Sequence, residues 1–199
     1  MRFSILKKCI WRIKNYIHNY DKKWDELAPD VNSMDQFVAE ILNSEPLTFL
    51  PGNSNEFTVE YQLAHYCAEY INPILRRCEE HPDIEKFLAA FAEKEIKKDI
   101  VLYRGICQEV LIANMRAAEG IEGVDLYDKA FLNTSLIKGA ELNYKTKIRI
   151  FVPKGTRAIF VGGVNNENYF YEVIVTKGAK LKILSKDKHY YNCILITTD

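Results

Sequence analysis

Apolar side chains in the first half of the chain recur every three or four residues, which is the spacing of one helical face. The clearest stripe predicts a helix over residues 1–27 and consists of Leu6, Ile10, Ile13, Ile17, Tyr20, Trp24 and Leu27. Further helices are predicted to start at Ser33, which with Gln36 has the spacing of a capping box, near Glu56, at Pro73 and at Pro82. The first half is therefore predicted to be helical.

The pattern changes at Asp99, after which short apolar runs alternate with glycine and proline turns. One more helix is predicted over residues 107–119. Strands are predicted at 100–103, around Thr134, and at 148–152, 158–161, 169–175, 181–184 and 190–196. Strands at this spacing without helices between them are typical of a mostly antiparallel sheet or sandwich. The expected class is α+β, with an N-terminal helical appendage (residues 1–50) and a main domain (51–199) divided into a helical part (51–98) and a β core (99–199).

Composition narrows the classes of partner. The chain has 199 residues, 48% of them hydrophobic, and 27 basic residues balance 27 acidic ones. A zero net charge gives no general attraction to nucleic acid or anionic membrane, and no apolar run reaches the length of a membrane span. Only residues 1–20 are locally basic, so the first helix either packs its stripe on the domain, which we favour, or contacts a surface. Nothing in the spacing of the five cysteines or four histidines predicts a metal site or a disulfide framework.

Three short elements could carry chemistry. Arg104 ends a predicted strand beside Gly105, where an arginine can bind phosphate or can simply form a surface ion pair. The run Asn133-Thr134-Ser135 offers three hydrogen-bonding side chains, or an exposed polar strand. Glu172 lies within an apolar strand and either faces water or is held at a site.

The order of these elements resembles the bacterial mono-ADP-ribosyltransferase toxins, in the branch with an arginine–serine–glutamate signature. The matching motifs occur in order and are Leu102-Tyr103-Arg104-Gly105, Phe131-Leu132-Asn133-Thr134-Ser135, Val152-Pro153-Lys154-Gly155-Thr156 and Glu172-Val173-Ile174-Val175. Upstream, Tyr70-Ile71-Asn72-Pro73-Ile74-Leu75-Arg76 is similar to the helix that precedes the arginine strand in those toxins. The resemblance covers about residues 56–185. It implies that the main domain is a catalytic domain of the ADP-ribosyltransferase type.

The resemblance also implies roles. Arg104 would hold the diphosphate or ribose of the co-substrate NAD+, Gly105 would lie against the nicotinamide, and Thr134 and Ser135 would shape the strand beneath it. Glu172 would be the catalytic carboxylate, because cleavage of the glycosidic bond builds positive charge that a fixed anion stabilises. No metal is implied.

Two positions depart from the family pattern. Asn133 replaces a serine, and its amide can donate a hydrogen bond to Glu172 as a hydroxyl can. Phe170 stands where the family has Glu or Gln, two residues before the catalytic glutamate on the same strand face. The sequence therefore does not predict which type of residue accepts the ADP-ribose. Tyr169, Phe170 and Tyr171 could instead form an aromatic contact with a protein substrate.

The leading hypothesis is therefore an NAD+-dependent mono-ADP-ribosyltransferase that modifies a protein. Such an enzyme would be a bacterial toxin or effector, secreted or delivered to a host cytosol, or otherwise cytoplasmic. The alternatives are an NAD+ glycohydrolase that uses water as acceptor, and a non-catalytic module that binds NAD+ or a protein.

Overall fold

A computed structural model describes residues 23–42, 58–162 and 170–199. Its helical elements are η1 (Trp24–Leu27), α3 (Met34–Ile41), α4 (Val59–Tyr66), η2 (Cys67–Ile71), α5 (Asn72–Arg76), α6 (Ile84–Ala90) and α7 (Gln108–Ala117). Its strands are β1 (Ile100–Ile106), β2 (Leu126–Asp128), β3 (Leu132–Ser135), β4 (Thr146–Val152), β5 (Ala158–Phe160), β6 (Glu172–Val175), β7 (Ala179–Lys186) and β8 (Tyr191–Thr197). The predicted α+β class, with helices preceding the strands, is confirmed.

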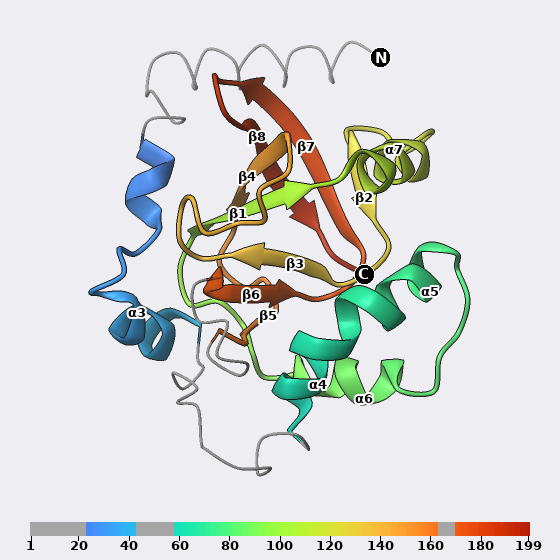
Figure 1. Cartoon of the computed structure of the whole chain (residues 1–199), viewed down its shortest axis with the longest axis horizontal. Coiled ribbons are helices and arrows are strands. Elements are labelled where there is room, and N and C mark those ends of the chain that lie inside the picture. The colour runs from blue at the N-terminus through green and yellow to red at the C-terminus, as the bar shows by residue number, and fades with distance from the viewer. Residues whose placement is uncertain (1–22, 43–57, 163–169) are drawn as a thin grey trace.

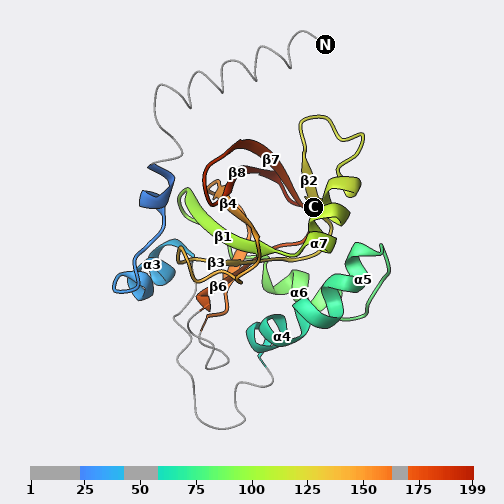
Figure 2. The ribbon, with the colours of Figure 1, turned by 45° about the horizontal axis from the view of Figure 1, so that its top comes forward.

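The strands form one sheet in the order β2-β7-β8-β4-β1-β3-β6-β5 (Figure 1). The neighbouring strands pair antiparallel except for β4 and β8, which are parallel. The sheet is strongly curved through β7 and β8 (Figure 2). Strand β1 pairs with β4 along its whole length but with β3 only at Tyr103 opposite Ser135. This single contact is where the two halves of the sheet join.

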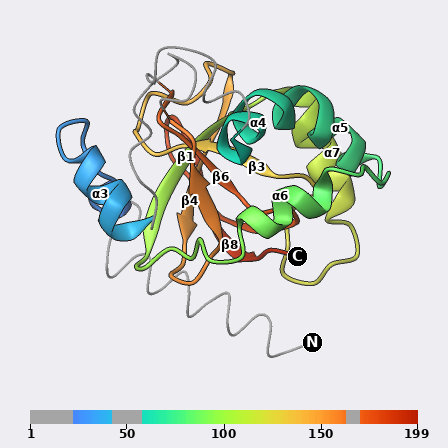
Figure 3. The same cartoon turned by 90° about the horizontal axis from the view of Figure 1, so that it is seen from below.

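One face of β3, β5 and β6 is covered by α4, η2, α5 and α6, which lie together on the same side of the sheet (Figure 3). The helices α4, η2 and α5 follow one another without a break, and the middle turn is a π-helix. Phe131 is the centre of the packing, since Phe91 stacks on its ring at 5.5 Å and Phe87 meets it edge-on at 6.2 Å. Burial of this aromatic group holds the helices on the strands.

Residues 23–42 also pack on the sheet. Val38 and Leu42 are fully buried in the cluster that contains the other face of the strands, and Trp24 is buried against Phe151, with ring centroids 5.6 Å apart. Lys97 donates its backbone N–H to the Ile41 carbonyl at 2.9 Å. The division at residue 50 stays a prediction, and most of the predicted helix over 1–27 lies outside the described residues.

Local structure differs from the sequence-based prediction at three places. Ser33 forms no capping box, because its hydroxyl donates to Asp30 Oδ1 at 3.1 Å. The strand β2 was not predicted, since its three residues are too short to show a period. The strand predicted over 169–175 begins only at Glu172, because Tyr171 has φ +45°, a left-handed conformation that interrupts the extended backbone.

Candidate active site

The pairing of β3 with β6 brings Asn133 to Glu172. Ser135 is the direct partner of Glu172, and Asn133 lies two residues further along β3, diagonally opposite. The Asn133 amide Nδ2 donates to Glu172 Oε1 at 2.8 Å. The hydrogen bond expected from the residue types is therefore present, and it fixes one oxygen of the carboxylate.

The backbone of Glu172 is held as firmly as its side chain. Its carbonyl accepts from both Val161 N at 2.9 Å and Gly162 N at 3.2 Å, so two residues of one chain segment oppose one residue of β6. On the other side, Leu136 N donates to the Tyr171 carbonyl at 2.9 Å. The first residue of β6 is thus anchored from both neighbouring segments.

Arg104 belongs to a buried cluster with Asp128 and Arg76. Asp128 is the last residue of β2, and its side chain is fully buried. Arg76, at the end of α5, bonds both Asp128 oxygens, with Nε at 3.0 Å and Nη2 at 2.9 Å. Arg104 Nη2 approaches Oδ2 at 3.3 Å. Two guanidinium groups share one carboxylate, so the cluster carries one net positive charge.

The second terminal nitrogen of Arg104, Nη1, is buried and has no hydrogen-bond partner in the described structure. Only about a tenth of the side chain is exposed. Burial lowers the pKa of the Arg104 guanidinium, while the charges of Asp128 and Glu172 oppose that effect, and an arginine remains protonated. An unsatisfied cationic donor beside an excess positive charge is suited to bind an anion.

The ionisation of Asp128 follows from the same contacts. Burial alone would raise the pKa of the Asp128 carboxyl, but the Arg104 charge and the Arg76 hydrogen bonds hold it below its ordinary value. Asp128 is therefore a permanent anion that aligns the two arginines. Neither Asp128 nor the role of Arg76 was predicted from the sequence. The only available signal was the Leu-Arg end of the helix motif, Leu75-Arg76.

Thr134 and Ser135 use their hydroxyls within the protein. Thr134 donates to the Val173 carbonyl at 2.6 Å, which reinforces the β3–β6 pair. Ser135 Oγ donates to the Ile137 carbonyl at 3.0 Å and accepts from Ile137 N at 3.2 Å, which shapes the turn after β3. Their predicted part in shaping the floor of a pocket stays a prediction.

Gly105 is needed for a close approach within the chain. A Cβ atom at this position would lie 1.8 Å from the Leu142 carbonyl oxygen, so only glycine allows the 136–145 segment to cross β1 here. The contact that the resemblance implied, with nicotinamide, stays a prediction.

The aromatic residues before Glu172 do not continue its strand. Tyr171 is partly buried and packs on the core with its left-handed backbone, and Phe170 is also partly exposed. The alternation that would put Phe170 on the same strand face as Glu172 therefore does not hold. Tyr169 lies outside the described residues.

A buried thiol adjoins the carboxylate. Cys67, in η2, is fully buried, and burial together with the negative charge of Glu172 raises its pKa to about 12. The thiol stays protonated and cannot compete with Glu172 as an anion. Among residues 23–42, 58–162 and 170–199 there is no group of three His, Cys, Asp or Glu side chains placed to hold a metal, and no helix there is long and apolar enough to span a membrane.

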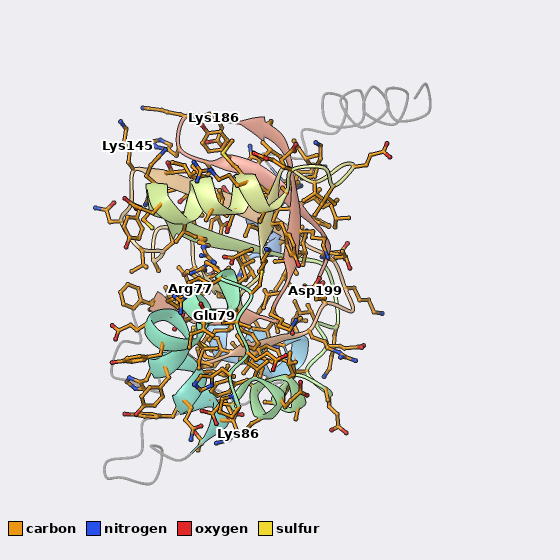
Figure 4. The ribbon with its side chains drawn as sticks, turned by 90° about the vertical axis from the view of Figure 1, so that its right-hand side faces the viewer. Arg77, Glu79, Lys86, Lys145, Lys186 and Asp199 are labelled. Atoms are coloured by element: carbon orange, nitrogen blue, oxygen red, sulfur yellow. The ribbon has the colours of Figure 1, made fainter. Side chains whose placement is uncertain are left out.

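Other charged groups near the helices pair with one another. Arg77 and Glu79, beyond the end of α5, form an exposed bidentate pair at 2.6 and 2.8 Å and lie next to each other in Figure 4. Arg76, the residue before Arg77, instead forms the buried pair with Asp128. Arg76 and Arg77 thus have different surroundings, which makes them a matched pair for mutagenesis.

Comparison with known proteins gives a family match and a set of similar folds. The family model described as ADP-ribosyltransferase exoenzyme matches residues 58–197. The C3 exoenzyme of Clostridium limosum has a TM-score of 0.60 at 15% identity, over 84% of this chain and 95% of that one. C3stau2 from S. aureus, solved with NAD, has a TM-score of 0.56 at 13% identity, over 85% and 97%. Plx2a, an ADP-ribosyltransferase toxin from Paenibacillus larvae, has a TM-score of 0.55 at 17% identity, over 73% and 87%. No curated protein matched in a sequence search.

Proposed function

The chain belongs to the ADP-ribosyltransferase exoenzyme family, and on that premise we propose that Glu172, Asn133 and Arg104 carry the transfer of ADP-ribose from NAD+ to a protein. The enzyme class predicted from the sequence, an NAD+-dependent mono-ADP-ribosyltransferase of the bacterial toxin and effector type, is confirmed by the family. The signature branch, the residue roles and the acceptor are parts of the proposal.

One observation carries the assignment of residues. A carboxylate held by an amide donor lies within electrostatic reach of a buried arginine that has an unpaired nitrogen. The reaction needs both groups, because NAD+ has an anionic diphosphate at its centre and develops positive charge on the nicotinamide ribose. A similar fold, C3stau2, was solved with NAD, which supports NAD+ as the ligand.

In the proposed mechanism Arg104 Nη1 donates to the diphosphate, and the Arg76–Asp128 pair keeps the guanidinium in place. The bond between ribose C1′ and the nicotinamide nitrogen then breaks, and its electron pair leaves with nicotinamide. Glu172 stabilises the oxocarbenium-like ribose, and Asn133 keeps the carboxylate oriented. A nucleophile of the acceptor forms the new bond at C1′, and its proton passes to a base of the target protein or to water.

The acceptor is proposed to be presented by a target protein that contacts the segment from Gly162 to Tyr169 together with Phe170 and Tyr171. Phe170 can neither take a proton from an acceptor nor bond to it, so the target must supply its own activated nucleophile or another base. The same observation favours one second candidate, hydrolysis of NAD+ with water as the acceptor. Contact of the basic residues 1–20 with a surface, and delivery into a host cytosol, remain part of the proposal.

Incubation with NAD+ labelled in the adenylate part and a host-cell lysate tests the proposal. Label in a protein band supports transfer, whereas nicotinamide release without a labelled band supports hydrolysis. Glu172→Gln and Arg104→Gln should strongly weaken either signal, and Arg77→Gln, which alters only an exposed ion pair, should not. If the wild-type chain neither consumes nor binds NAD+, both transfer and hydrolysis are refuted.

A further inference from the structure

Asn72, the first residue of α5, lies behind Asn133 and is almost completely buried. Its side-chain amide forms three hydrogen bonds. Oδ1 accepts from Phe131 N at 3.1 Å, and Nδ2 donates both to the Phe131 carbonyl at 3.1 Å and to Asn133 Oδ1 at 2.8 Å. Asn72 therefore links the helical layer to the strand that carries Asn133.

The backbone of Phe131 determines which way the Asn72 amide points. A backbone N–H can only donate and a backbone C=O can only accept, so Oδ1 must face the Phe131 N–H and Nδ2 its carbonyl. With that orientation, the second proton of Asn72 Nδ2 points at Asn133. The contact has a fixed direction, because Asn133 can only meet it with its oxygen.

The orientation of Asn133 in turn determines which of its atoms faces the Glu172 carboxylate. Because Asn133 Oδ1 faces Asn72, Asn133 Nδ2 must face Glu172. A reversed Asn133 amide would place two donors together at Asn72 and two acceptors together at Glu172. Serine, the residue of the family pattern, needs no such control, since its hydroxyl proton rotates to suit. An asparagine at this position needs a neighbour that selects one of its two orientations.

Resting on the proposed function, we propose that Asn72 is a positioning residue that sets the Asn133 amide so that it donates to Glu172. The relay runs from the Phe131 backbone through Asn72 and Asn133 to the catalytic carboxylate. It couples the α5 helix to the reacting end of β6. In this relay Asn72 acts on turnover through the orientation of the Asn133 amide.

A double-mutant cycle of Asn72→Ala and Asn133→Ser tests the relay, with nicotinamide release from NAD+ as the assay because it needs no protein acceptor. Asn72→Ala should lower kcat by about tenfold, as expected for an oriented hydrogen bond to a charged group. Asn133→Ser supplies the second background, because a serine hydroxyl can donate to Glu172 without a neighbour that orients it. In the Asn133→Ser background, Asn72→Ala should then change kcat by less than about threefold. The dissociation constant of NAD+ should stay within about twofold throughout.

Asn192→Ala is the matched control. Asn192 is also fully buried and hydrogen-bonded, to Arg149 Nε at 2.8 Å and Ser185 Oγ at 3.0 Å, but it lies in β8. It should lower the unfolding midpoint as Asn72→Ala does and leave kcat unchanged. If Asn72→Ala does not fold, Asn72→Ser takes its place, because a small hydroxyl leaves room for water to bond to the Phe131 backbone.

A readout that does not depend on activity is the side-chain NH2 resonance pair of Asn133 in ¹⁵N-labelled protein, assigned by its loss in Asn133→Ser. In the wild type, the two protons of the Asn133 side-chain amide should exchange slowly with solvent. In Asn72→Ala they should exchange faster, and their chemical shifts should lose the displacement that hydrogen bonding causes. An equal loss of kcat on Asn72→Ala in both backgrounds, or unchanged resonances, would overturn the relay. A wild-type chain that releases no nicotinamide would instead overturn the proposed function, and the resonances would still test the relay.

Discussion

Replacing Arg104 by glutamine should cost NAD+ affinity but little stability. In the folded chain Arg104 forms one charge-assisted contact, at 3.3 Å to Asp128, and carries one buried unpaired nitrogen. The contact is worth about 1.5–3 kcal/mol, and an unsatisfied buried donor costs about 1–3 kcal/mol. The two effects oppose each other and are similar in size. Arg104→Gln should therefore change the free energy of unfolding by no more than about 1 kcal/mol.

The equivalent change at Arg76 should, in contrast, lower the stability of the chain clearly. Arg76 supplies both short side-chain bonds to the buried Asp128, and Arg76→Gln leaves that carboxylate with the longer Arg104 contact and the Ala130 N–H at 3.2 Å. Breaking a buried pair from one side costs about 3–5 kcal/mol, which the remaining arginine reduces to roughly 2–4 kcal/mol. Arg77→Gln, which removes only an exposed pair, should leave the free energy of unfolding almost unchanged.

Urea unfolding at pH 7 and calorimetric titration with NAD+ measure the two quantities. Loss of a charge-assisted bond to the diphosphate, about 2 kcal/mol, corresponds to a roughly 30-fold higher dissociation constant for Arg104→Gln. A larger loss of stability in Arg104→Gln than in Arg76→Gln, or wild-type affinity of Arg104→Gln for NAD+, would refute these roles of the two arginines.

The remaining predictions concern the parts of the fold that support the site. Gly105→Ala should destabilise the chain by at least about 1–3 kcal/mol in urea unfolding, because its Cβ would overlap the Leu142 carbonyl; wild-type stability would show that the 136–145 segment yields freely. Trp24→Ala should cost about 3–5 kcal/mol, since the indole is buried on Phe151; a loss below about 1 kcal/mol would mean that this segment is dispensable. Burial would raise the pKa of the Asp25 carboxyl, but bonds from Lys138, Arg149 and Tyr103 hold it below its ordinary value. Asp25 therefore adds stability that is complete above about pH 4 and disappears as the pH falls through the lowered folded-state pKa. Asp25→Asn should flatten the acid side of the stability curve, and an unchanged curve would contradict this account.

The sequence was sufficient for the long elements and for the order of the site residues. The alternation of apolar positions in Ile148–Val152 and the stripe of α6 depend only on local periodicity, and both elements are present. The Asn133–Glu172 bond was also expected, because it follows from two residue types once the family resemblance is accepted. Local chemistry and order were enough for these features.

Features that depend on contacts distant in sequence could not be predicted. Asp128 lies in a three-residue strand, and its importance comes from Arg76 and Arg104, which are 52 and 24 positions away in the chain. Asn72 was part of a quoted motif, but its three bonds to residues near 131 require the folded packing. The left-handed Tyr171 was missed because an aromatic residue gives no sequence signal for positive φ.

Nicotinamide release by Glu172→Gln is the most direct test of the central claim. The substituted amide can still accept from Asn133 through its oxygen and fits the same space, so the fold and NAD+ binding should be preserved while the fixed negative charge is lost. We expect kcat to fall by about 10²–10³-fold, with the dissociation constant of NAD+ within a few-fold of the wild type. Release of nicotinamide at the wild-type rate would contradict the assignment of Glu172 as the carboxylate that opens NAD+.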